Sequence, residues 1–205
     1  MKIALCFSGQ PRFVAECAQS IKTHLMAGHE VDVFAHLWWD KAYIGEIFRF
    51  HCFDQYESDM KSVFLDQYRD RLKCGIFEPQ KQFDITLPSE EGAWGKTLKS
   101  VWKKEVRFKQ LSMFYSLKQV QTLLDNYIES TQNKYDMFVR CRTDIMFTKS
   151  IDFARCNEDK LYFDTFGSNG IGIEDYFVCS PNHRNLKVFQ TMYDTMPLLL
   201  NGMKP

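Results

Sequence analysis

The sequence lacks the glycine-rich fingerprints of the commonest nucleotide-binding proteins. Neither G-x-G-x-x-G nor G-x-x-x-x-G-K-S/T occurs in its 205 residues, which disfavours a Rossmann dehydrogenase and a P-loop NTPase. Net charge is also lacking, because 26 Lys and Arg residues balance 26 Asp and Glu residues. A neutral chain has no overall attraction to nucleic acid or to an anionic membrane. We therefore expect no nucleic-acid partner, and any anion binding must be local.

Long apolar runs and closely paired cysteines are missing as well. No stretch approaches the roughly 20 apolar residues that span a bilayer, and no signal peptide is visible. The seven cysteines include no C-x-x-C pair, which favours buried free thiols in a reducing compartment over a zinc site or a disulfide framework. We expect a cytoplasmic protein with no membrane span.

The length of the chain suits one domain over residues 1–205. Its last fifteen residues, TMYDTMPLLLNGMKP, have the pattern of a helix that is cut short with apolar side chains still uncovered. We therefore expect the chain to be the N-terminal part of a longer polypeptide. A C-terminal tail that docks on the domain explains the same pattern equally well.

The opening forty residues predict a β-α-β unit. Lys2–Phe7 is a nearly continuous apolar run, which is typical of a strand buried on both faces of a parallel sheet. Apolar residues then recur at helical spacing from Val14 to Leu25, and Gly28 closes this helix. Val31–Trp38 is the next strand. We expect these two strands to be parallel, with a right-handed crossover.

The rest of the chain adds helices before strands. We expect helices over Ala42–Phe53, Ser58–Leu72 and Val106–Ile128, a polar loop over Asp84–Lys96, and strands over Gly75–Phe77, Lys160–Phe166 and Tyr176–Ser180. Together with the β-α-β unit, this order predicts an α/β fold with a mixed, mostly parallel central sheet and helices on both faces.

One unusual stretch, Tyr135–Phe147 (YDMFVRCRTDIMF), combines apolar and charged residues. Read as a strand, it places Arg140, Arg142 and Asp144 on one face, because side chains alternate along a strand. Buried guanidinium and carboxylate groups are costly unless something pairs with them. A diphosphate with a divalent cation would do so. An Arg–Asp ladder on a solvated edge strand is an alternative of equal weight.

The turn Ser8–Arg12 follows the first strand, where open α/β sheets bind their ligands. Free backbone N–H groups at a helix start, together with Arg12, could hold a phosphate. Gly9 would let the backbone approach it closely. An ordinary β-α turn remains the simpler alternative.

Aromatic and acidic residues mark two further strand ends. Trp38 ends the second strand, where it could stack on a base or belong to the core. Glu174 and Asp175 follow a glycine-rich turn and precede an apolar strand. Acids in such a place can ligate a metal, orient a sugar hydroxyl or serve in catalysis. Solvated turn acids are the common alternative.

Five segments in this order resemble one known family, the GT-A-fold glycosyltransferases. The segments are SGQPR, DVFAHLW, QLSMFYSLKQ, YDMFVRCRTD and IEDYFVCS. They are most similar to the glycosyltransferases of chlorella viruses, which are large algal DNA viruses, and to related surface-polysaccharide transferases. The resemblance covers most of the chain and is weakest from Ala42 to Lys104. If the chain is viral, its location would be the host cytoplasm.

The resemblance implies a UDP-sugar donor, a glycan acceptor, and Mn²⁺ or Mg²⁺ bound through a D-x-D-type motif. Here that motif reads Arg142-Thr143-Asp144, so Asp144 alone carries over as a metal ligand. Arg142 replaces the first acid and would contact phosphate or sugar. Asp175 matches the acidic position near the donor sugar and the acceptor. Whether Asp175 is a base, a nucleophile or a hydroxyl ligand stays open.

The expected function is thus transfer of a hexose or deoxyhexose from a UDP-sugar to a glycan. Asp175 and Arg142 are the expected catalytic residues, and Asp144 is the expected metal ligand. The expected donor-binding residues are Ser8, Gly9, Gln10, Arg12, Trp38, Arg140, Arg142 and Glu174. A nucleotidyltransferase and a non-catalytic nucleotide- or glycan-binding module are the alternatives.

Overall fold

The structure is a computed structural model that describes residues 1–45, 56–83, 100–163 and 176–200. Its centre is a six-stranded sheet with the order β3-β2-β1-β4-β6-β5. The strands are β1 (Lys2–Gly9), β2 (Glu30–Trp38), β3 (Leu72–Glu78), β4 (Met137–Cys141), β5 (Tyr162–Phe163) and β6 (Phe177–Ser180). The pairs β1–β2, β1–β4 and β2–β3 are parallel, whereas β6 is antiparallel to β4 and to β5. The mixed, mostly parallel sheet is as predicted.

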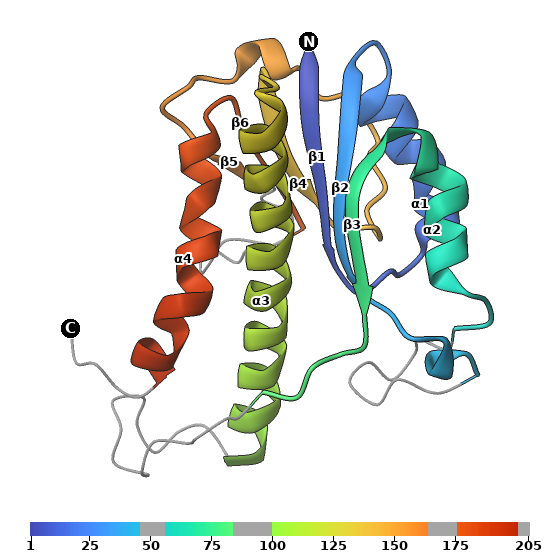
Figure 1. Ribbon diagram of the computed structural model, residues 1–205, viewed down its shortest axis with the longest axis vertical. Helices are drawn as coiled ribbons and strands as arrows, with labels where there is room; N and C mark the ends of the chain where they lie inside the picture. Colours follow the sequence, from blue (N-terminus) through green and yellow to red (C-terminus); the bar gives the residue numbers. More distant parts are fainter. Residues whose placement is uncertain (46–55, 84–99, 164–175, 201–205) are drawn as a thin grey trace.

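Helices cover both faces of this sheet (Figure 1). The helices α1 (Val14–Ile21) and α2 (Met60–Tyr68) pack on one face. The helices α3 (Ser100–Thr131) and α4 (His183–Leu200) pack on the other. The chain is therefore an α/β protein. No helix within the described ranges is long and apolar enough to cross a membrane.

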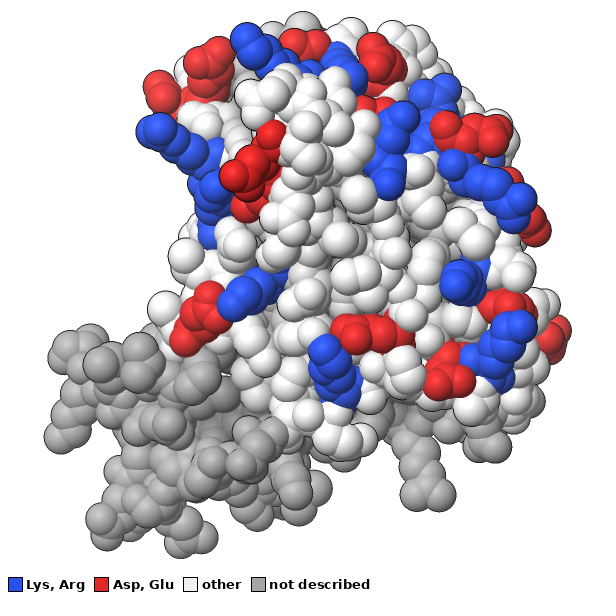
Figure 2. Space-filling view, in the orientation of Figure 1, with Lys and Arg blue, Asp and Glu red and all other residues white. Residues whose placement is uncertain are grey.

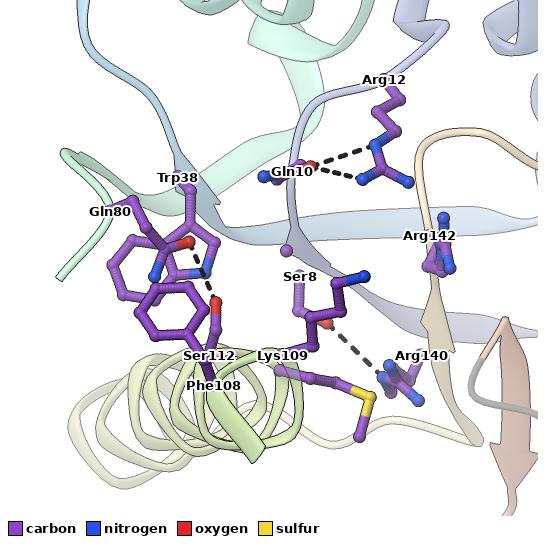
Figure 3. Close-up of a pocket in the computed structure, with 12 residues that line it drawn as sticks. Ser8, Gln10, Arg12, Trp38, Gln80, Phe108, Lys109, Ser112, Arg140 and Arg142 are labelled. Carbon is purple, nitrogen blue, oxygen red and sulfur yellow. Dashed lines mark hydrogen bonds between the residues drawn. The ribbon is translucent and has the colours of Figure 1, made fainter. Parts of the chain in front are cut away.

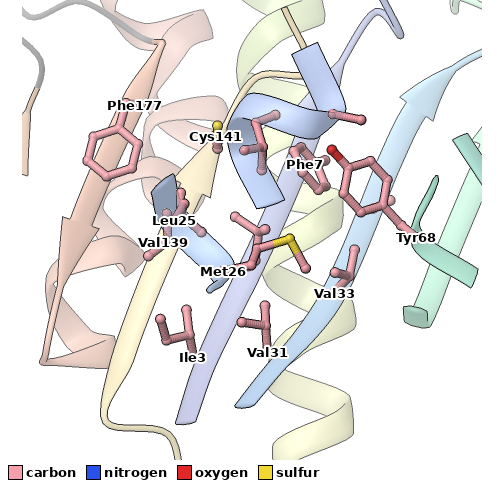
Figure 4. Close-up of a cluster of buried hydrophobic side chains, with 14 of the residues drawn as sticks. Ile3, Phe7, Leu25, Met26, Val31, Val33, Tyr68, Val139, Cys141 and Phe177 are labelled. Carbon is pink, nitrogen blue, oxygen red and sulfur yellow. The ribbon is translucent and has the colours of Figure 1, made fainter. Parts of the chain in front are cut away.

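Strand β1 shows why the sheet is covered on both sides. Its residues from Ile3 to Phe7 are at most 3% exposed. Alternate side chains point to opposite faces, so Leu5 and Phe7 join the core beneath α1 and α2, while Cys6 joins the core beneath α3. Figure 4 shows the first of these cores, in which Phe7 lies beside Tyr68 of α2 at 4.9 Å between ring centroids. Burying one such side chain contributes about 1.5–3 kcal/mol.

The opening β-α-β unit is confirmed, with small changes at the element ends. α1 continues directly into one π-helical turn over Lys22–Met26. Gly28 then adopts φ +76°, a left-handed conformation that glycine reaches without a steric penalty. The sequence predicted that the helix ends near Gly28, because the conformation of the turn residue determines where a helix ends.

Other predicted elements differ in their bounds. The helix over Val106–Ile128 is longer, because α3 runs from Ser100 to Thr131. The helix predicted over Ser58–Leu72 ends at Tyr68, a 3-10 turn follows, and Leu72 already begins β3. Lys41–Tyr43 forms a 3-10 turn where a longer helix was expected. Residues 46–53, 84–96 and 164–166 of the predicted elements lie outside the described residues.

The prediction of one strand through Tyr135–Phe147 is wrong, because β4 ends at Cys141. The Arg142 N–H donates to the Tyr176 carbonyl oxygen at 3.0 Å, and the chain then turns. The hydroxyl of Thr143 fastens this turn by donating to the carbonyl oxygen of Arg12 at 2.9 Å. Only Arg140 therefore lies on the strand. Arg142 and Asp144 lie in the turn that follows it.

Candidate functional site

A cavity of about 190 Å³ opens where β1, β2 and β4 reach their carboxyl ends (Figure 3). This is the edge at which open α/β sheets bind ligands. Small-molecule pockets typically measure roughly 300–1,000 Å³, so the described walls enclose less volume than a typical ligand site. Seven of the predicted site residues line it, namely Ser8, Gly9, Gln10, Arg12, Trp38, Arg140 and Arg142.

Five further lining residues were not predicted from the sequence. They are Gln80, which follows β3, and Phe108, Lys109, Ser112 and Met113 on α3. The Ser112 hydroxyl donates to Gln80 Oε1 at 2.9 Å, which joins the two elements across the cavity wall (Figure 3). One sequence signal could have located this wall. Ser112 and Ser116 are small polar residues one turn apart on a helix whose core-facing stripe is mostly apolar.

The charge of the cavity is positive. Arg12, Lys109, Arg140 and Arg142 line it, and none of the described lining residues is acidic. Arg140 is only 3% exposed, and its Nε donates to the Ser8 hydroxyl at 3.4 Å. Charges gathered in a partly closed site interact more strongly than charges in water. The cavity is therefore suited to an anion.

Aromatic rings support two of these guanidinium groups. The Arg142 guanidinium carbon lies 4.7 Å from the centroid of the Tyr176 ring, and that of Arg140 lies 5.6 Å from the centroid of the Phe189 ring. Both distances are within the range of a cation–π contact. The rings hold the guanidinium planes in place before any ligand arrives.

Asp144 forms a two-point ion pair with Arg142. Nε of Arg142 donates to Oδ1 at 2.8 Å, and Nη2 donates to Oδ2 at 2.5 Å. The side chains of Arg142 and Asp144 are only 24% and 13% exposed. Such paired hydrogen bonds between a guanidinium and a carboxylate are strong and directional. Asp144 therefore fixes the orientation of Arg142.

The divalent cation that the resemblance implies can be tested against these donors. Hard cations such as Mg²⁺ and Mn²⁺ require oxygen ligands, chiefly carboxylates. Both carboxylate oxygens of Asp144 are already bound by Arg142. Within the described part of the chain, no group of three His, Cys, Asp or Glu side chains could hold a metal. The described residues thus do not fit a metal site, and the metal role of Asp144 stays a prediction.

The first turn supplies side chains to the cavity rather than free backbone groups. The Gly9 N–H donates to the Ser116 hydroxyl at 2.7 Å, and the Arg12 N–H donates to the Gln10 carbonyl oxygen at 2.9 Å. Pro11 has no N–H. The expectation of free N–H groups at this turn is therefore wrong for Gly9 and Arg12. Instead, the Gln10 side chain accepts from Nε and Nη2 of Arg12 and orients that guanidinium (Figure 3).

A buried network beneath the cavity holds Gly9. The Ser116 hydroxyl lies 2.8 Å from His36 Nδ1, and His36 Nε2 lies 2.9 Å from Glu78 Oε1. Burial lowers the pKa of His36, although the hydrogen bond to Glu78 opposes this. A neutral ring can donate from Nε2 to Glu78 and accept from Ser116. His36 and Ser116 have no exposed surface, so this serine is a support and not a nucleophile.

Trp38 lies at the boundary between core and cavity. It is 2% exposed and stacks on Tyr115 at 5.4 Å between ring centroids. Its faces are therefore occupied by protein, which favours the core interpretation over base stacking. Its Nε1 atom is buried and has no hydrogen-bond partner within the described residues. A ligand acceptor in the cavity could supply that partner.

Glu174 and Asp175 lie outside the described residues, so their predicted roles stay predictions. Comparisons with known proteins add no assignment, because neither a family model nor a curated protein matches this chain.

Proposed function

We propose that this protein is a glycosyltransferase that moves a hexose or deoxyhexose from a UDP-sugar to a glycan acceptor. The proposal rests on one observation. Four cationic side chains line a cavity at the carboxyl ends of three adjacent parallel strands. The resemblance to GT-A-fold transferases supports the same conclusion, and with it the proposal that the mixed sheet is of the GT-A type.

The positive cavity matches the charge that develops in such a reaction. The bond between the anomeric carbon and a diphosphate oxygen breaks, and its electron pair stays on the diphosphate. The acceptor hydroxyl oxygen bonds to the anomeric carbon, and its proton passes to a general base, which is one of the three roles left open for Asp175. Fixed cations around the departing diphosphate stabilise the transition state more than the ground state. Arg140 and Arg142 are the residues proposed for this task.

The experiment is to incubate the protein with a panel of nucleotide sugars and follow release of nucleoside diphosphate. We expect release from one UDP-sugar, increased by a suitable glycan acceptor. Turnover only with nucleoside triphosphates would favour a nucleotidyltransferase. Binding without release would favour a non-catalytic module.

The matched control is Arg155→Gln. Arg155 has an 87% exposed side chain, pairs with Asp152 and does not line the cavity. It should leave release unchanged, whereas Arg142→Gln should lower it strongly. Equal activity of these two variants would remove Arg142 from the proposed mechanism.

A further inference from the structure

We propose that the Arg142–Asp144 pair stands where a divalent cation would act, so that the site binds a nucleoside diphosphate without a metal. Asp144 is then a positioning residue for Arg142. This inference rests on the proposed function, and it specifies how that site recognises its donor.

The first argument is the occupancy of Asp144. Both of its oxygens accept from one guanidinium, at 2.8 and 2.5 Å. A dication ligated by Asp144 would have to displace that guanidinium or share oxygens with it, and like charges so close repel. A diphosphate is instead attracted to the guanidinium, because its negatively charged oxygens pair with the N–H groups of an arginine.

The second argument is that the turn carrying Arg142 is fixed before a ligand binds. The backbone N–H of Arg142 donates to the Tyr176 carbonyl oxygen at 3.0 Å, and the guanidinium lies over the Tyr176 ring. Thr143, which is 2% exposed, donates to carbonyl oxygens of the turn that carries Arg12. The two arginine-bearing turns are therefore tied together. Fixed positive groups need little reorganisation when negative charge develops.

The third argument is the charge balance of the described cavity. Its lining includes three arginines and one lysine, and the adjacent Asp144 is the carboxylate that orients one of them. A lining with cationic side chains suits an anionic ligand. A site designed around a metal would instead need several carboxylates.

The test is to measure UDP binding by calorimetry in EDTA and again in excess Mn²⁺, with GDP and CDP as comparison ligands. We expect the dissociation constants for UDP to agree within about twofold between the two conditions. Arg142→Gln should weaken UDP binding by about tenfold or more in both conditions, because it removes the charge and the N–H groups proposed to pair with the diphosphate. Arg142→Lys should recover part of that loss, since it restores charge without the planar fork.

Asp144→Asn separates positioning from metal binding. If Asp144 orients Arg142, the variant should weaken UDP binding by the same factor in EDTA and in Mn²⁺, and Asp144→Glu should recover part of the affinity. A thermal melt of each variant shows whether it is folded, and Arg155→Gln is the control.

Each outcome decides one question. UDP binding that requires Mn²⁺ would overturn the inference and leave the proposed function standing. If no nucleoside diphosphate binds under either condition, the proposed function itself fails. Binding in EDTA with the expected variant pattern supports both.

Discussion

The two ends of the sheet both contain buried charge, but they treat it differently. At the amino end, Asp32 of β2 is 5% exposed and accepts from the Tyr135 hydroxyl at 2.7 Å. Lys73 and Lys2 lie 3.3 and 3.7 Å from its two oxygens. At the carboxyl end, cationic side chains line a cavity without a described acidic lining residue. Paired charges of opposite sign hold the fold together at the amino end, whereas cationic side chains at the carboxyl end line a cavity that suits an anionic ligand.

The face of the molecule seen in Figure 2 does not show this difference. On the face seen in Figure 1, basic and acidic side chains of the described residues lie intermixed (Figure 2). The zero net charge of the sequence describes that surface well. It gives no indication of the positive cavity, because a sum over the chain hides a local surplus.

The largest expected effect concerns the amino end. Asp32→Ala should lower the free energy of unfolding by about 2–3 kcal/mol, because it removes the acceptor of the Tyr135 hydroxyl and the carboxylate beside Lys73. Lys2 keeps its ion pair with Glu30. UDP affinity of the folded fraction should not change. Urea unfolding combined with calorimetry measures both quantities, and a loss of affinity without a loss of stability would break the comparison.

The second largest effect concerns Arg140, a buried charge at the carboxyl end of the sheet. Arg140→Gln should weaken UDP binding by about tenfold, which corresponds to about 1.4 kcal/mol. Its melting temperature should fall less than that of Asp32→Ala. Glutamine keeps a donor for Ser8 while it removes the charge. If Arg140→Gln lowered the melting temperature more than Asp32→Ala, or if Asp32→Ala weakened UDP binding more than Arg140→Gln, the contrast between the two ends of the sheet would be wrong.

A smaller effect should follow from Ser116→Ala. The substitution removes the acceptor of the Gly9 N–H and a hydrogen bond to His36, at a cost of about 1 kcal/mol each in stability. It should also weaken UDP binding a few-fold, because Gly9 borders the cavity. Ser116→Thr, if it folds, keeps the hydroxyl and should recover the affinity. An unchanged affinity in Ser116→Ala would show that the turn needs no support from α3.

The smallest effect is a dependence of stability on pH. Burial lowers the pKa of His36 in the folded state, so the unfolded state takes up a proton first as the pH falls below the ordinary histidine value of about 6.5. Stability is therefore complete above that pH and declines below it. His36→Gln should flatten this decline between about pH 6.5 and 5. Melting curves across that range check the sign, and a wild-type protein that gains stability on acidification would contradict it.

Glu78 adds to the same trend at lower pH. Burial alone would raise the pKa of its carboxyl, but the hydrogen bond and charge of His36 outweigh this and leave it below its ordinary value. The stability from this carboxylate is thus present above its unfolded pKa and lost as the pH falls through the folded one. The residual slope in His36→Gln should be smaller than in the wild type, because Glu78 then lacks the interaction with the His36 ring that lowers its pKa.

The sequence predicted the fold where local patterns control it. The β-α-β opening depends on apolar spacing and on Gly28, all of which lie within residues 2–38. The end of β4 could not be predicted in this way. Alternation continues through Arg142 and Asp144, and contacts with Tyr176 and Arg12 turn the chain away.

In the site, too, local patterns revealed some residues and contacts between distant parts of the chain determine others. The seven predicted lining residues lie at the ends of apolar strands, which the sequence reveals. Gln10 and Asp144, which orient Arg12 and Arg142, are close in the chain, but other partners lie far away. Ser116, which binds the Gly9 N–H, is 107 residues from Gly9. The wall formed by α3 was missed because a helix with an apolar stripe indicates packing and not a lining surface.

The hydroxyl of Thr143 couples the turn that carries Arg12 to the turn that carries Arg142. Its oxygen lies 2.9 Å from the Arg12 carbonyl and 3.3 Å from the Gln10 carbonyl, and one hydrogen serves both. A sequence change that shifts one turn must therefore shift the other. In related chains, we expect substitutions around Arg12 and around Arg142 to occur together, and in a double-mutant cycle their energies should fail to add.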